Sequence, residues 1–179
     1  MEKSRIQRIG LCTAIALIVC VMSAGAHAYG GGNWNAFRID GVNDNARARI
    51  IAIQSIFGEI IRGRAGSDQW PVPALRETRD TLITVKEEVD EVLEHYVIDG
   101  INIQMFANLQ AEPRAGRTVA ASRALDAGIA LIDHAASFAS ADDFIADFYG
   151  GGLAARLYEL LEAHGERMDL YKLLTPVEE

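Results

Sequence analysis

The strongest constraint on the fold is an apolar seam in residues 75–96. Its members recur at alternating spacings of three and four residues: Leu75, Thr78, Leu82, Val85, Val89, Val92 and Tyr96. These are the spacings of heptad a and d positions, maintained for three heptads, and they place one stripe on one face of a helix. The opposite face is acidic, with Glu77, Asp80, Glu87, Glu88, Asp90, Glu91 and Glu94. The seam predicts packing inside an antiparallel bundle, or one strand of a coiled coil between subunits.

Further stretches have the same helical periodicity. A helix is expected from Asp44 to Arg62, with Gly63 as its stop, and others over residues 101–111, the alanine-rich stretch 117–139, and 153–174. Ser140 with Asp143 resembles a capping box and predicts a helix that starts at Phe144, while three consecutive glycines at 150–152 predict a break before the last helix. We therefore expect an all-α protein: a single antiparallel helical bundle of four to five helices over residues 46–179, with an irregular N-terminal arm.

That arm, residues 29–45, is rich in glycine and asparagine, which favours extended structure over a helix. Its aromatic side chains would dock either on the same domain or on a neighbouring subunit. The loop over residues 64–73 has one aromatic residue at its centre. The candidate partner contacts are therefore Tyr29, Trp34, Phe37 and Trp70.

The first 28 residues have the pattern of a secretory signal peptide. A basic start precedes an apolar run over residues 11–22, and Ala26-His27-Ala28 supplies the small residues of a cleavage site. The run is shorter than the ~20 residues that a membrane-spanning helix needs. We expect cleavage after Ala28, with Ala26 and Ala28 as the recognised positions, no stable membrane anchor afterwards, and a periplasmic or extracellular mature protein that begins at Tyr29.

Cleavage at that site would remove both cysteines and would change the net charge of the mature chain. Cys12 and Cys20 both lie in the leader, so the mature chain would have no disulfide and no cysteine-ligated metal. The net charge of −8 would become about −10, because the leader removes three basic residues and one acidic residue. A surface of that charge repels phosphate backbones, so we expect a protein partner or self-association and no nucleic acid.

The histidines provide little evidence for a cofactor or a metal site. A di-iron bundle needs Glu-x-x-His pairs, but Val92, Leu131 and Leu161 stand three residues before His95, His134 and His164. His164 with Met168 is a chemically allowed haem ligand pair, although a hydrogen-bonded, partly buried histidine is commoner. The cofactor candidates are thus His134, His164 and Met168, with no cofactor and no metal predicted.

No catalytic residue is predicted either. The chain has no G-x-S-x-G, no H-E-x-x-H and no P-loop. Several arginines, which could bind an anion or an acidic partner helix, are expected to pair instead with the acids of residues 75–96: Arg47, Arg49, Arg62, Arg64, Arg76 and Arg79. The sequence favours a non-catalytic exported interaction or structural subunit, such as an accessory part of a cell-envelope assembly. The alternatives are a helical carrier of a small apolar ligand or haem, and a small exported all-helical enzyme acting on an anionic metabolite.

Overall fold

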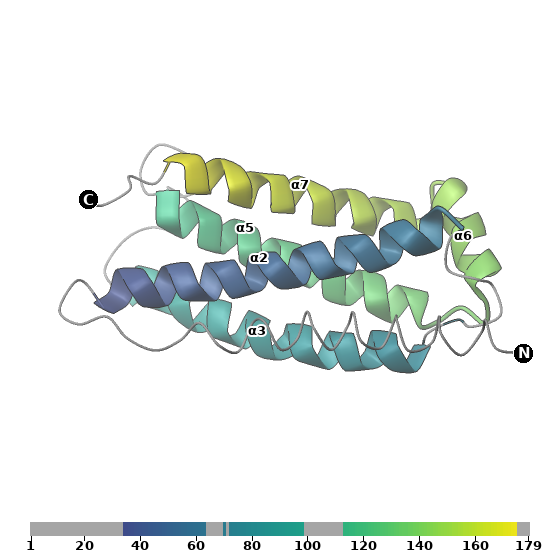
Figure 1. Ribbon diagram of the computed structural model, residues 1–179, viewed down its shortest axis with the longest axis horizontal. Helices are drawn as coiled ribbons and strands as arrows, with labels where there is room; N and C mark the ends of the chain where they lie inside the picture. Colours follow the sequence, from purple (N-terminus) through teal and green to yellow (C-terminus); the bar gives the residue numbers. More distant parts are fainter. Residues whose placement is uncertain (1–33, 64–69, 71, 99–112, 175–179) are drawn as a thin grey trace, which may run out of the picture. The chain divides into compact units, whose positions relative to one another are not determined.

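The computed structural model describes residues 34–63, 70, 72–98 and 113–174, and within these ranges all regular structure is helical. The helices are α2 (Trp34–Ile61), α3 (Val72–Ile98), α5 (Pro113–Ala135), α6 (Ala141–Tyr149) and α7 (Leu153–Leu174). Figure 1 shows α7 along the upper edge and α3 along the lower edge, with α2 and α5 between them and the short α6 at one end. The expected all-α bundle is confirmed.

The seam of α3 faces the core, as predicted. Leu75, Leu82, Val85, Val89 and Val92 are each at most 3% exposed, and Thr78 is half-buried. On the opposite face the acidic side chains are exposed, apart from the partly buried Asp90. Only the side chain of Tyr96, at the end of the seam, lies outside the described residues.

Helix α5 approaches all three of its long neighbours at Gly128. A Cβ atom at this position would lie 2.8 Å from Ile53 of α2, 3.7 Å from Leu161 of α7 and 3.8 Å from Leu82 of α3. The alanine-rich sequence of α5 allows this close approach because small side chains keep the helix axes near one another. The largest fully buried side chains around it come from every helix and include Phe57, Leu82, Leu125, Leu131, Ile132, Phe144, Leu161 and Met168.

Helix α2 begins earlier than the sequence suggests. Residues 34–45, expected as part of an extended arm, are helical. Asn43 is fully buried there, and its Nδ2 donates a hydrogen bond of 2.9 Å to Thr118 Oγ1 on α5. Arg38 pairs with Glu91 of α3 at 2.8 Å. These contacts with distant residues offset the low helix propensity of asparagine and glycine. The rest of the arm, residues 29–33, lies outside the described residues.

Three predicted helix boundaries have the residues and backbone geometry expected, whereas α5 (Pro113–Ala135) begins and ends four residues before the predicted stretch 117–139. Gly63 follows α2 in the left-handed region, with φ +66°, and its N–H donates to Ile60 O at 2.9 Å. Ser140 caps α6 by accepting the Asp143 N–H at 3.2 Å, so the helix begins at Ala141 rather than at Phe144. Gly151, with φ +72°, lies in the break between α6 and α7.

The expected helix over residues 101–111 and the leader, residues 1–28, fall outside the described residues. The contacts divide the chain into two units, residues 1–34 and 35–179, and the packing described above is that of the second. None of the described helices is long and apolar enough to cross a lipid bilayer.

Candidate functional site

Helix α7 has apolar residues on two faces, and only one of them packs against the bundle. The inner face contains the buried residues Ala154, Leu161, Gly165, Met168 and Tyr171. Tyr171 covers Gly116 of α5, where a Cβ atom would lie 2.7 Å from the ring carbon Cζ. Gly165 lies against α2, where a Cβ atom would be 3.5 Å from Ile50 Cγ2. The inner face therefore fixes α7 onto both α5 and α2.

The other face forms what we call the outer seam of α7. Its members again alternate spacings of three and four residues, for three heptads: Leu153, Arg156, Leu160, Ala163, Arg167, Leu170 and Leu174. The four leucines of this seam are 44 to 50% exposed. Of the seven exposed large hydrophobic side chains in the described chain, five lie on α7, the fifth being Leu173. Single exposed leucines are ordinary on protein surfaces, but this concentration on one helix is not.

In the part of the chain that the structure describes, the charges along the outer seam have no partners on neighbouring helices. Arg156 and Arg167 occupy seam positions, and Glu159 and Glu166 flank them at heptad g positions. Within the described residues the one polar contact of this set is a 3.4 Å approach of Arg167 Nη1 to His164 Nδ1. Elsewhere Arg47 binds Asp169 through two hydrogen bonds of 2.7 Å, and the buried Arg117 binds Asp44 at 2.6 Å. The outer seam thus combines uncovered leucines with uncompensated charges of both signs.

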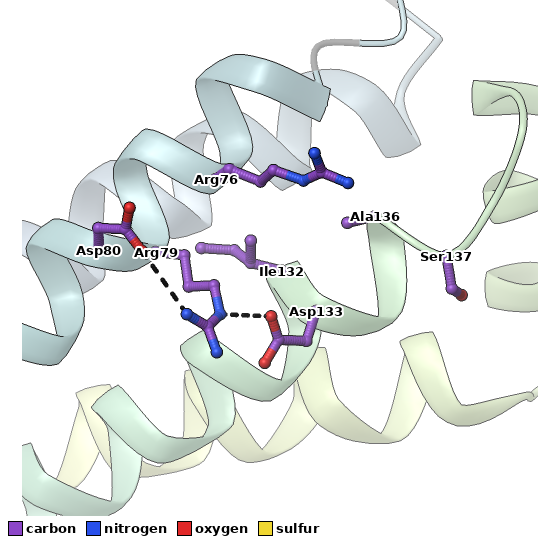
Figure 2. Close-up of a pocket in the computed structure, with 7 residues that line it drawn as sticks. All are labelled: Arg76, Arg79, Asp80, Ile132, Asp133, Ala136 and Ser137. Carbon is purple, nitrogen blue, oxygen red and sulfur yellow. Dashed lines mark hydrogen bonds and ion pairs between the residues drawn. The ribbon is translucent and has the colours of Figure 1, made fainter.

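An open hollow of about 430 Å³ lies between α3 and α5 (Figure 2). Arg79 occupies its centre, where its Nε donates to Asp133 Oδ1 at 2.5 Å and its Nη1 lies 3.6 Å from Asp80 Oδ1. The hydrogen bond to Asp133 is the main cause of a raised Arg79 pKa. Two aspartates therefore balance this arginine and Arg76, which leaves no net positive charge for an anionic ligand. A second hollow, of about 480 Å³, lies between α2 and α3 and is also lined mainly by polar side chains.

His134 lies where α5, α6 and α7 meet. Its Nε2 lies 3.1 Å from Asp147 Oδ2, and its ring meets Phe138 edge-on at 4.9 Å. Asp147 also accepts the Ala154 N–H at 3.0 Å, and this bond, followed by the one from His134, lowers the pKa of Asp147. A Cβ atom on Gly152 would collide with the Asp147 carboxylate. The glycine break predicted from the sequence thus leaves space for the Asp147 carboxylate, which accepts a hydrogen bond from the first turn of α7.

The other two cofactor candidates lie elsewhere. Met168 is fully buried in the core. His164 is half-buried, and its pKa is lowered by burial and by Arg167 and Arg123. Arg123 precedes His134 by eleven residues on α5, about 16 Å along the helix, so the two histidines do not face one site. No group of three histidine, cysteine, aspartate or glutamate side chains in the described part of the chain is placed to hold a metal ion.

The remaining candidates divide into those that pack inward and those that are not described. Trp70 lies 5.6 Å from Phe144, ring centroid to ring centroid, and is half-buried against the core. Tyr29 and Arg64 lie outside the described residues, as do the side chains of Trp34, Phe37 and His95. Arg47 and Arg79 pair mainly with Asp169 of α7 and Asp133 of α5, and Arg62 pairs with Glu59 of α2. The expectation that α3 supplies the acidic partners is wrong for Arg47 and Arg62, and it is correct in part for Arg79, which also lies 3.6 Å from Asp80 of α3.

The outer seam was not predicted, although its spacing is present in the sequence. Apolar residues occupy both the inner face and the outer seam of α7, so they surround much of the helix. The sequence therefore does not show the clear division into one apolar and one polar face that an amphipathic helix has. Only the packing distinguishes the two faces. No family model, curated protein or solved structure matches this chain.

Proposed function

We propose that this protein is an exported, non-catalytic interaction subunit that contacts its partner through the outer seam of α7. One observation supports this most strongly: Leu153, Leu160, Leu170 and Leu174 remain about half exposed along three heptads. An apolar stripe of this spacing is how one helix recognises another helix or a hydrophobic groove.

The fold leaves part of the apolar surface of α7 exposed to water. Burying a leucine side chain fully contributes about 1.5–3 kcal/mol, so each half-exposed leucine of the outer seam retains about 1 kcal/mol of stabilisation for a partner. The bundle already has a core supplied by all its helices, including the inner face of α7. The outer seam is therefore available for association without loss of folding contacts.

Export is the second part of the proposal, and it rests on the sequence of residues 1–28. If Ala28 is the last leader residue, the intact mass of the protein isolated from the envelope or medium will correspond to a chain that begins at Tyr29. Retention of residues 1–28 on that protein would contradict the proposed cleavage.

Photo-cross-linking in living cells tests the interaction role directly. A photoreactive phenylalanine analogue at Leu160 should give discrete adducts of higher mass, because this position would lie inside the contact. The same analogue at Glu87, on the exposed acidic face of α3, is the matched control and should give none. Absence of adducts from Leu153, Leu160 and Leu170 alike would contradict the proposal.

A further inference from the structure

We infer that Asp147 of α6 is the N-terminal cap of α7 and that it thereby positions the first turn of the outer seam, which carries Leu153. This inference rests on the proposed interaction function and assigns a positioning residue to it. Three observations support it: a buried N–H of α7 that donates to this carboxylate, a glycine where a capping residue ordinarily stands, and a histidine of α5 beside the carboxylate.

The first turn of α7 needs a hydrogen-bond acceptor from outside the helix. The bond from Arg156 N to Gly152 O closes this turn, so the N–H groups of the residues between them have no partner within the helix. Ala154, one of these residues, is fully buried, and its N–H donates to Asp147 Oδ2 at 3.0 Å. Without the carboxylate this buried donor would lose its acceptor, and water could not replace it.

The residue at the usual capping position cannot supply that acceptor. An N-cap residue ordinarily accepts, through its own side chain, an N–H two or three residues later. Gly152 stands there and has no side chain, whereas Asp147, five residues earlier, provides the oxygen. The three atoms nearest to a Cβ on Gly152 all belong to the Asp147 carboxylate, and they would collide with it. The glycine and the carboxylate are therefore two parts of one cap.

His134 holds the capping carboxylate from the last turn of α5. Its Nε2 lies 3.1 Å from the same oxygen, Oδ2, that accepts the Ala154 N–H. The edge-on contact of its ring with Phe138 restricts the orientation of the imidazole. The bond from Ala154, followed by that from His134, holds the pKa of Asp147 below its usual value. The carboxylate is therefore charged at neutral pH, where it complements the positive end of the α7 dipole.

The cap lies at one end of the outer seam only. Leu153 is the first residue of α7, precedes the capped Ala154 and is 50% exposed. Leu170 stands further along the same seam, about 25 Å away along the helix axis. An uncapped α7 would fray in its first turn and displace Leu153, while Leu170 would stay in place. The two leucines therefore distinguish a local effect of the cap from a general loss of structure.

Photo-cross-linking from both ends of the seam tests the positioning role. In Asp147→Ala, adducts from a photoreactive phenylalanine analogue at Leu153 should fall to about half or less of the wild-type yield, and those from Leu170 should be unchanged. Exchange of the Ala154 N–H, followed by NMR, should accelerate about fivefold. Unchanged Leu153 adducts in Asp147→Ala would overturn the inference.

The matched control is Tyr149→Phe, on the same helix. It removes the hydrogen bond of 3.2 Å from the Tyr149 hydroxyl to Ile61 O and leaves the Asp147 carboxylate in place. Neither the Leu153 adducts nor the exchange at Ala154 should change. An effect as large as that of Asp147→Ala would show that loosening of α6, and not the cap, moves Leu153.

Moving the cap to its ordinary position separates capping from a merely structural role. Asp147→Ala removes the atoms that a side chain at Gly152 would meet, and Gly152 is not in the left-handed region, so Gly152→Asp can be combined with it. The double variant should recover Leu153 adducts and return exchange at Ala154 to within about twofold of wild type. His134→Ala should reduce Leu153 adducts in the wild-type chain but not further in Asp147→Ala. A double variant that does not recover, or equal losses at Leu153 and Leu170, would contradict the inference.

The pattern of adducts also separates this inference from the function on which it rests. If Leu160 and Leu170 of the wild-type chain give adducts and Leu153 gives none, the positioning role fails while the interaction role stands. If none of the three leucines gives adducts, both fail. Adducts from Leu153 that are lost in Asp147→Ala and regained with Gly152→Asp support both.

Discussion

Helices α3 and α7 were built from the same heptad spacing, yet they use it differently. In α3 one seam is buried, the opposite face is acidic, and none of the side chains described on this helix is a large exposed hydrophobic one. In α7 the buried inner face is accompanied by a second seam of half-exposed leucines. A bundle position requires one apolar face of a helix. The second seam of α7 is therefore not needed for the fold, and the proposed interaction role rests on it.

Substitutions on the two faces of α3 should differ most. Val89 is fully buried, so Val89→Asp would place an unpaired carboxylate among the core side chains and cost about 3–5 kcal/mol of unfolding free energy. Its neighbour Glu88 is exposed on the acidic face, and Glu88→Ala should change stability by less than about 0.5 kcal/mol. Urea unfolding of both variants measures the difference. Equal effects would show that the assigned helix face is wrong.

Substitution of a glycine inside the core should destabilise the protein, whereas substitution of an exposed glycine should stabilise it. Gly128→Leu would force a side chain between Ile53, Leu82 and Leu161, and overpacking of this kind costs about 1–3 kcal/mol. Gly41 is exposed on α2 with no atom near its missing Cβ, so Gly41→Ala should stabilise the protein by about 0.5–1 kcal/mol. Thermal unfolding of the two variants gives the comparison. A destabilised Gly41→Ala protein would argue against a helix over residues 34–45.

A smaller effect is expected from the titration of His164 on α7. Burial and two nearby arginines lower its folded-state pKa below the ordinary value of about 6.5, so the unfolded chain binds the proton first as pH falls. Its contribution to stability is therefore present above pH 6.5 and is lost progressively below it, until the folded-state pKa is reached.

Replacing His164 should reduce the dependence of stability on pH. His164→Gln is expected to reduce the loss of stability between pH 7.5 and pH 5.5, measured from urea midpoints. Arg123→Gln, which removes one of the positive neighbours, should give an intermediate slope. An unchanged slope in the His164→Gln protein would contradict the role assigned to His164.

Local patterns were sufficient to predict much of this fold. The α3 seam, the Gly63 stop, the Ser140 cap and the glycine break before α7 each depend on a few adjacent residues and on rules of backbone geometry. The helical start of α2 could not be predicted in that way. Asn43 is held by Thr118, 75 positions away, and such a contact exists only after α2 and α5 have packed.

The candidate site was less predictable than the fold for the same reason. The spacing of Leu153, Leu160 and Leu170 is visible in the sequence. The inner residues Leu161 and Met168 have the same kind of helical spacing, so the sequence alone does not show which set is buried. Which set is buried depends on where α2 and α5 lie. The ion pair of Arg79 with Asp133 likewise joins two helices whose register no local pattern specifies.

The most direct test of the central claim is a paired measurement on Leu160→Arg. A photoreactive phenylalanine analogue at Leu153 should give discrete adducts of higher mass in the otherwise wild-type chain, and Leu160→Arg should abolish them because it places a charge in the same seam. Unfolding of the two purified proteins should differ by less than about 0.5 kcal/mol, because Leu160 lies outside the core. A variant that gives the same adducts as wild type, or one that unfolds with a loss comparable to that of Val89→Asp, would contradict the account.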